Sequence, residues 1–417
     1  MTNRFGIIGY STLSQGIGGS IKRRYSDFIV EEIQENGRVC EAKKFVEKGF
    51  VEGEKLVVPE NPESKQHLHL DLEKINKDLN FVIRKLARFL QCSKKRFGYA
   101  GLKDKRAVTG QRISIFQPDT KKLENFFSRG VELRNPEWSD ERIELGKHWG
   151  NGFIVVIRDI KLGKKESEKR IKEFFREAEE KGIANFFGEQ RFGGLRAITH
   201  VVGKELVKKK FEEAVMLYLT TSFEKEKKEI KEARQNLEKT MDFSKAVKEF
   251  PKECAFEKAI LNHLIKNQRD FLGALRVLPK QMQYLFTHAL QSYLFNLVIS
   301  ERLEKGLKKI EGDVLVNNIP TAPLFGFKTK FAEKKAGQIE KMVLEKEGLK
   351  PEDFKIREFP ELSSKGARKE ILLFPKEMKL LEIGKDEFFE GKNFAKISFK
   401  LEKGNYATTV LRELMKN

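Results

Sequence analysis

The sequence predicts an α+β fold in which a helix-rich segment interrupts a mixed domain. Strand-like and helix-like segments alternate irregularly up to about residue 204, Lys/Glu-rich helical patterns dominate residues 204–275, and both kinds return near the C-terminus. We therefore expect a discontinuous domain of residues 1–204 and 370–417, and an inserted domain of residues 205–369.

The N-terminal part contains the clearest periodic patterns. A short β-like segment falls within residues 20–33, and residues 76–91 place apolar side chains at helical spacing. Residues 111–116 and 152–158 are predicted strands, and residues 164–181 are a charged helix with one apolar face. This mixture of strand-like and helical spacing of apolar residues is typical of an α+β domain rather than of a helical bundle.

The remaining segments are predicted to be mainly helical. Residues 222–238 almost lack a wide apolar face and predict a solvated helix, whereas residues 281–304 form a stronger helical pattern. Residues 305–330 contain proline and glycine breakers and predict turns and short strands. A strand over 397–401 and a helix over 407–416 complete the chain.

Composition narrows the possible partners. The 417 residues include 82 Lys+Arg and 62 Asp+Glu, and the resulting net charge of +20 favours a polyanion such as nucleic acid. The 39% of hydrophobic residues predicts a globular chain rather than a basic disordered one. No run is long and apolar enough for a signal peptide or a membrane span. We expect a soluble, cytoplasmic protein, a monomer by default.

The sequence offers no clear metal site. Cys40, Cys92 and Cys254 are too scattered for a disulfide framework or a zinc site. His67 and His69 lie on one face of a strand-like segment, where an ordinary strand face is favoured over a metal pair. We therefore expect no metal.

The most informative segment runs from Gly98 to Gln111. It places one carboxylate, Asp104, among six cations, and its glycines predict sharp turns that let a large partner approach. Such an acid suggests a nucleophile or base that acts on a polyanion; the alternative is a surface turn whose aspartate pairs with neighbouring lysines. The cations are Lys94, Lys95, Arg96, Lys103, Lys105 and Arg106.

A second dense segment, residues 184–194, reads Ala-Asn-Phe-Phe-Gly-Glu-Gln-Arg-Phe-Gly-Gly. An aromatic ring can stack on an unstacked base while amides and cations meet its polar edge and its phosphate. The alternative is a turn whose phenylalanines fill the core.

Together these segments strongly resemble the two signature motifs of the TruD family of tRNA pseudouridine synthases, in the same order. Residues 22–31, Lys-Arg-Arg-Tyr-Ser-Asp-Phe-Ile-Val-Glu, are similar to the family's N-terminal element, and residues 401–413 to its C-terminal element. Residues 366–369, followed by 372–375, resemble a weaker fifth motif. Tyr-Ser before Asp-Phe, and Glu-Lys before the Gly of the C-terminal element, depart from the family pattern.

The resemblance implies a fold and a reaction. Family members have a pseudouridine synthase catalytic domain with a mixed, mainly antiparallel sheet and flanking helices, interrupted by a family-specific α/β, helix-rich insertion. The reaction breaks the N1–C1′ bond of uridine, turns the uracil and rejoins it through C5. The resemblance implies tRNA as the partner and neither a cofactor nor a metal.

By residue match, Asp104 is the expected catalytic aspartate and Lys22 its basic partner. Whether Asp104 attacks C1′ of the sugar or abstracts a sugar proton stays open. Asn185 and Phe187 fall on the residues that hold and stack the target base, with Gln190 and Arg191 beside them in the same motif. Tyr406 sits where the family often has a phenylalanine near the active site.

The resemblance also implies position 13 of tRNA as the modified uridine, and some relatives also modify position 35. Two alternatives stay open: a non-catalytic RNA-binding or RNA-folding protein that uses the same groove, and a pseudouridine synthase that acts on another RNA.

Overall fold

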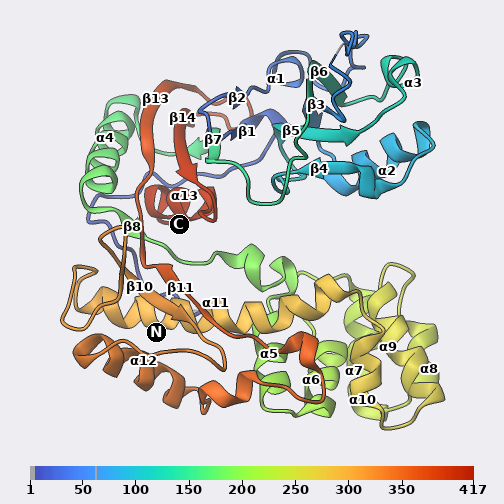
Figure 1. Cartoon of the computed structure of the whole chain (residues 1–417). Helices are drawn as coiled ribbons and strands as arrows, with labels where there is room; N and C mark the ends of the chain where they lie inside the picture. The colour runs from blue at the N-terminus through green and yellow to red at the C-terminus, as the bar shows by residue number, and fades with distance from the viewer. Residues whose placement is uncertain (1–4, 62) are drawn as a thin grey trace. The chain divides into compact units, whose positions relative to one another are not determined.

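The computed structural model describes residues 5–61 and 63–417, and the chain divides into two compact units. The first, here called the sheet unit, joins residues 12–183 to residues 374–417 (Figure 1). The second, the helical unit, joins the segment before residue 12 to residues 184–373. The chain therefore passes between the units more than once, and each unit is discontinuous in sequence.

The assignment of a catalytic domain and an inserted domain stays a prediction. Its boundaries, 204/205 and 369/370, fall inside helix α5 (Thr199–Val207) and strand β11 (Ala367–Glu370) of the helical unit.

The sheet unit is built on a nine-stranded sheet whose main path runs β13-β14-β7-β1-β5-β3-β6, with β2 paired to β1 and β4 to β5. In the described registers β1 and β5 run parallel, with Ile29 opposite Val108, and the other pairs are antiparallel. This confirms the predicted mixed, mainly antiparallel sheet. The strands are β1 (Phe28–Ile33), β2 (Val39–Cys40), β3 (His67–Ile75), β4 (Phe97–Tyr99), β5 (Val108–Phe116), β6 (Val131–Ser139), β7 (Gly150–Ile160), β13 (Lys376–Lys385) and β14 (Asn393–Glu402).

Helix α2 (Leu79–Phe89) covers one part of this sheet. Its buried residues, among them Val82 and Leu86, share a core cluster with leucines of β3 and isoleucines of β5. The helix begins where the Asp78 side chain accepts a hydrogen bond from the amide of Phe81, which is a standard N-cap. The helix predicted over 76–91 is therefore present and slightly shorter.

The described residues of the sheet unit form four further α-helices. Helix α4 has the predicted bounds and buries Ile171 and Phe174, and α13 corresponds to the helix predicted over 407–416. Glycines at 163 and 182 flank α4 and explain its sharp ends. The helices are α1 (Lys44–Lys48), α3 (Thr120–Glu124), α4 (Lys164–Lys181) and α13 (Ala407–Met415).

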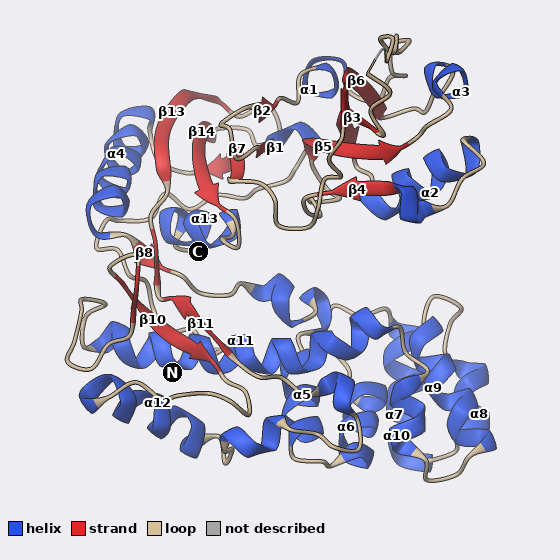
Figure 2. Cartoon of the chain, viewed as in Figure 1, coloured by secondary structure: helices blue, strands red, loops and turns tan. Residues whose placement is uncertain are grey.

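The helical unit surrounds the long helix α11 (Lys280–Glu304), which packs against α5, α12 and β10 (Figure 2). A small sheet follows the order β11-β10-β9, and the short strands β8 and β12 pair where the chain changes unit. The remaining elements are α6 (Phe211–Thr220), α7 (Lys228–Thr240), α8 (Phe243–Glu249), α9 (Ala255–Lys266), α10 (Phe271–Arg276), α12 (Lys334–Lys346), β8 (Ile183–Ala184), β9 (Leu315–Val316), β10 (Ile319–Leu324) and β12 (Leu372–Leu373).

Helix α7 is less solvated than its composition predicts. It buries Ala233 and Leu237, and Arg234 is only 1% exposed. The Arg234 guanidinium forms ion pairs with Glu226 and Glu257, both nearly buried. The expectation of a solvated helix fails on this face because a charged side chain with complete ion pairing can take the place of an apolar one.

Candidate active site

Asp104 lies on the loop that joins β4 to β5 in the sheet unit. One end of the loop is fixed by a hydrogen bond of 2.8 Å from the Gly146 amide to the Ala100 carbonyl. The other end is fixed by a hydrogen bond of 3.0 Å from the Asn76 amide to the Ala107 carbonyl. Backbone contacts therefore hold the loop at both ends although it has no regular structure.

The glycines around this loop serve close packing rather than the sharp turns expected from the sequence. Gly98 lies in β4 and Gly110 in β5, and a β-carbon on either would collide with neighbouring backbone. Those neighbours are the carbonyl oxygen of Ile143 for Gly98 and that of Cys40 for Gly110. The glycines are required because another segment of backbone passes directly over each strand.

Lys22 and Asp104 form the ion pair that the family resemblance predicts. The Nζ atom of Lys22 lies 2.9 Å from Oδ1 of Asp104, and their side chains are 14% and 34% exposed. The same ammonium lies 4.0 Å from the centre of the Phe28 ring, a cation–π contact. Lys22 also has a left-handed backbone with φ of 60°, which costs a non-glycine residue about 1–2 kcal/mol. The surrounding contacts therefore hold Lys22 in a strained position that points its amine at Asp104.

The six neighbouring cations do not act as one group. Lys94, Lys95, Lys105 and Arg106 are exposed and can contact a polyanion. Arg96 donates hydrogen bonds to two backbone carbonyls, those of Phe116 and Gln117. Asp104 pairs with Lys22, which is distant in sequence, so the alternative of a surface turn closed by neighbouring lysines is wrong.

Lys103 differs from the other cations because it is buried. Its Nζ atom lies 2.7 Å from Oε2 of Glu32, with side chains 3% and 1% exposed. The other carboxylate oxygen of Glu32 accepts a hydrogen bond from the backbone amide of Arg112. The pair ties the residue next to Asp104 to strand β1. Glu32 is therefore a buried structural partner of Lys103.

Asn185 and Phe187 lie in the helical unit. The Asn185 side-chain amide donates a hydrogen bond of 3.1 Å to the Glu370 carbonyl, and the backbone of Phe187 is bound at both N–H and C=O by the side chain of Asn296. The Phe187 ring packs edge-on against Phe295 with centroids 5.4 Å apart. Phe187 is 6% exposed, so stacking of a base on this ring requires that neighbouring groups move.

Gln190 and Arg191 follow on the short 3-10 helix Glu189–Phe192. Gln190 is exposed, and Arg191 donates from Nε to the hydroxyl of Ser292 at 3.0 Å. The Arg191 guanidinium lies 5.6 Å from the centre of the Phe187 ring. The structure thus brings the predicted aromatic and cationic residues of this motif together.

Tyr406 is the N-cap residue of α13 in the sheet unit and is 40% exposed. The predicted residues therefore fall into two groups. Lys22, Asp104 and Tyr406 belong to the sheet unit, and Lys22 contacts Asp104 directly. The residues of the 184–194 segment belong to the helical unit.

Sequence reasoning missed Lys74, a wholly buried residue of β3. Its Nζ atom donates a hydrogen bond of 3.1 Å to the backbone carbonyl of Asp104. Burial lowers the pKa of Lys74 to about 8, with Asp104 and Asp78 opposing that shift. One signal was available: Lys74 continues the alternating row of Leu70 and Leu72, where an apolar residue is expected.

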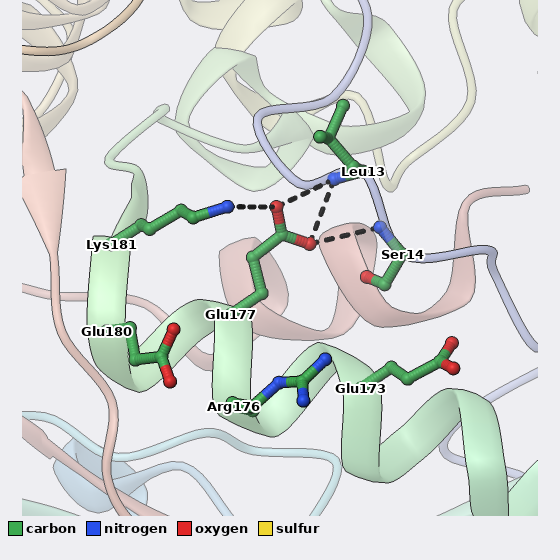
Figure 3. A pocket seen from close by; sticks show the side chains of 7 residues that line it. All are labelled: Leu13, Ser14, Glu173, Arg176, Glu177, Glu180 and Lys181. Carbon is green, nitrogen blue, oxygen red and sulfur yellow. Dashed lines mark hydrogen bonds and ion pairs between the residues drawn. The ribbon is translucent and has the colours of Figure 1, made fainter.

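A separate hollow of about 430 Å³ lies along α4 and contains none of the predicted site residues. Figure 3 shows the Glu177 carboxylate in this hollow, facing the backbone amides of Leu13 and Ser14. The lining also includes Glu173 and Glu180, so three carboxylates stand against two cations, Arg176 and Lys181, and the hollow is not a basic surface for a phosphate backbone. We therefore assign this hollow a structural role, the attachment of the segment around residue 13 to α4.

Among residues 5–61 and 63–417, no group of His, Cys, Asp and Glu side chains could hold a metal ion. Within the same described ranges, no helix is long and apolar enough to cross a membrane. The pair His67 and His69 lies on β3, where the Nε2 atom of His69 contacts the Glu141 carbonyl at 2.7 Å.

Comparison with known proteins agrees with this fold and with the family that the motifs resemble. The family model that matches is "tRNA pseudouridine synthase D (TruD)", over residues 4–320 and 316–414. The fold and motifs thus define a pseudouridine synthase of the tRNA-modifying kind. The chain belongs to the TruD family.

Curated archaeal proteins match the chain over nearly its whole length. "Probable tRNA pseudouridine synthase D" of Methanosarcina acetivorans is 39% identical, covering 99% of this chain and 96% of that protein. The protein of the same name from Methanosarcina mazei is 38% identical, with 99% and 97% covered. A Methanosarcina mazei crystal structure assigned to tRNA pseudouridine synthase D superposes with a TM-score of 0.80 at 38% identity, covering 99% of this chain and 97% of that one.

Proposed function

We propose that this chain converts uridine to pseudouridine at position 13 of tRNA, with Asp104 as the catalytic carboxylate. One observation carries the assignment of Asp104. In a chain that belongs to the TruD family, this aspartate lies on an anchored loop and pairs at 2.9 Å with Lys22, the residue expected from the family pattern. A carboxylate held in this way is oriented before the substrate binds, which is the condition for efficient attack or proton abstraction.

The reaction requires that the N1–C1′ bond breaks, that the uracil turns, and that a C5–C1′ bond forms. C5 then gives up its proton and N1 takes one, so the product is an isomer of uridine. In our proposal Asp104 acts on the ribose as nucleophile or base, and Lys22 keeps its carboxylate in place. The reaction is an isomerisation, so it consumes no second substrate, and we propose no cofactor.

Substrate binding is proposed to use the second group of residues together with Tyr406 of the sheet unit. Asn185 and Phe187 hold the target base, Gln190 and Arg191 contact its polar edge or phosphate, and Tyr406 packs near the nucleoside. Removal of a base from its stack costs a few kcal/mol, and stacking on an aromatic side chain returns about 1–3 kcal/mol. The net charge of +20 supplies further binding through phosphate contacts. We further propose that the protein acts as a monomer in the cytoplasm.

The proposal is tested by incubating purified protein with unmodified tRNA transcripts and mapping pseudouridine by carbodiimide labelling and mass spectrometry. We expect one modified uridine at position 13, and no product when that uridine is replaced by cytidine. Asp104→Asn is expected to bind tRNA normally and to form no product. Product from Asp104→Asn would refute the assignment of the carboxylate.

The same experiment separates the alternatives. A non-catalytic RNA-binding or RNA-folding protein would bind the transcript without forming product. A pseudouridine synthase for another RNA would leave tRNA unmodified and would modify ribosomal or small RNA fragments in a parallel incubation. A product at another tRNA position would keep the reaction and correct only the position.

A further inference from the structure

Lys74 is a buried cation in an apolar row of the sheet unit. Strand β3 alternates, so Leu70, Leu72 and Lys74 point to the same side of the sheet, and the Lys74 side chain is fully buried. A lysine is almost never fully buried without a specific partner, because removal of its charge from water is costly. The position therefore needs an explanation beyond packing.

The partner of Lys74 is the backbone of Asp104. The ammonium donates to the Asp104 carbonyl at 3.1 Å, while Lys22 holds the carboxylate of the same residue at 2.9 Å. Gln111, on the adjacent strand β5, donates to the Gly101 carbonyl at 3.1 Å. Paired strands thus hold the loop at two carbonyls, and one of them belongs to Asp104 itself.

We propose that Lys74 is a positioning residue: its ammonium fixes the Asp104 peptide and thereby the direction in which the Asp104 carboxylate points. This inference rests on the proposed function, in which Asp104 reacts with the nucleotide. An ionised donor makes a hydrogen bond about twice as strong as a neutral one. A misplacement of about 1 Å in a reacting group can lower a rate about 100-fold.

The charge on Lys74 is expected to change within an accessible pH range. Burial lowers its pKa to about 8; Asp104 and Asp78 raise it, and Lys103 lowers it further. On the adjacent strands, the residues opposite Lys74 are the uncharged Thr109 of β5 and Val131 of β6. As Lys74 loses its proton, the hold on the Asp104 carbonyl weakens, and the rate should fall.

The lowered pKa of Lys74 also distinguishes a role in positioning Asp104 from a role in stabilising the fold. The pKa of Lys74 is lower in the folded than in the unfolded chain, so the unfolded chain binds more protons between pH 8 and 10.5. The free energy of unfolding should therefore rise with pH across that window, and the charged lysine works against folding below it. A neutral apolar replacement should keep stability while it lowers the rate.

The test compares wild type, Lys74→Met and Lys74→Arg in steady-state conversion of tRNA transcripts from pH 6.5 to 9.5. We expect Lys74→Met to lower kcat about 10- to 100-fold with KM changed less than about twofold. Lys74→Arg keeps a permanent charge. Its kcat should stay level above pH 8, where the wild-type kcat declines.

Lys44→Met is the matched control. Lys44 is also a largely buried lysine of the sheet unit, but its partners are Glu54 and Glu132 rather than the loop. This variant should lower thermal stability and keep kcat and its pH profile.

If the wild type forms pseudouridine and Lys74→Met has the same kcat at every pH, the inference about Lys74 is wrong while the proposed function stands. If Lys74→Met does not fold, as judged by circular dichroism, the Lys74→Arg profile decides, and a decline identical to that of wild type contradicts the inference. A wild-type protein that forms no pseudouridine would contradict the proposed function, and with it this inference.

Discussion

The two groups of candidate residues are held in place by different kinds of contact. In the sheet unit, Asp104 is held by charge: the ion pair with Lys22, the ammonium of Lys74, and the adjoining pair of Lys103 with Glu32. In the helical unit, neutral hydrogen bonds and ring packing hold Asn185 and Phe187, and the Arg191 guanidinium adds a cation–π contact to the Phe187 ring.

This difference matches the two tasks of the proposed reaction. Bond breaking at a sugar needs a charged group with fixed direction, and ion pairs in a partly buried site supply both. A pyrimidine base is neutral, and aromatic rings and amides suit it better. We therefore expect substitutions of Lys22 and Asp104 to lower kcat, and substitutions in the second group to raise KM.

The largest expected effect concerns the buried ion pair of Glu32 with Lys103, the residue next to Asp104. Glu32→Gln should lower the free energy of unfolding by about 3–5 kcal/mol, because the buried ammonium of Lys103 loses its counter-charge. Urea denaturation followed by circular dichroism measures this change. The double variant Glu32→Gln/Lys103→Met should recover much of the loss, since no unpaired charge remains. A cost below about 1 kcal/mol in the single variant would mean that the pair is not buried as described.

Lys22→Met should lower kcat about 100-fold, which corresponds to about 3 kcal/mol of transition-state stabilisation. The reason is the loss of the ion pair that fixes the Asp104 carboxylate. Steady-state kinetics on tRNA transcripts should show KM nearly unchanged, and Lys22→Arg should recover part of the rate. A change in KM with normal kcat would place Lys22 in substrate binding and would weaken the contrast between the two groups.

Phe187→Leu is the corresponding test in the helical unit. The loss of one stacked ring should weaken tRNA binding by about 1–3 kcal/mol, while kcat at saturating tRNA changes little. Filter binding and steady-state kinetics measure the two quantities. Phe250→Leu is the control, because Phe250 is buried in the same unit beside Arg234 and belongs to no predicted site. Equal effects of both variants on KM would indicate loss of packing rather than loss of a base contact.

The smallest expected effect concerns Glu177, a charged residue of the sheet unit outside the loop. Burial raises the pKa of Glu177, but amide hydrogen bonds from Leu13 and Ser14 and the charge of Lys181 outweigh it, and the net pKa is lowered from 4.5. The folded-state pKa is depressed, so the stabilisation is complete above pH 4.5 and is lost as pH falls through the folded-state value.

Glu177→Gln should therefore lower stability by about 1 kcal/mol at pH 7, and the difference from wild type should shrink below pH 4.5. Thermal denaturation at several pH values measures it, and kcat should not change. A lower kcat would show that charge outside the loop also serves the chemistry.

Local elements were predictable from the sequence. Helix α4 follows from the apolar spacing of residues 171–178, and β5 contains the predicted strand at residues 111–116. The pairing of Lys22 with Asp104 was available only through the family resemblance, since 82 positions separate the two residues.

The support behind Asp104 could not be predicted in this way. The Glu32–Lys103 pair depends on which strands are neighbours, because β1 lies parallel to β5 in the sheet. The contact of Lys74 with the loop depends in the same way on the pairing of β3 with β5. Local periodicity does not encode such long-range pairings. The local signal for this support was a cation, Lys74, in an otherwise apolar row of the strand.

The most direct test is a single-turnover measurement at saturating tRNA with Asp104→Asn, paired with the tRNA affinity of the same variant. We predict a rate lowered at least about 1000-fold with an affinity within about threefold of wild type. Conversion of uridine at the wild-type rate would contradict the assignment of the chemistry to this carboxylate. A variant whose tRNA affinity falls together with its conversion rate would contradict it as well.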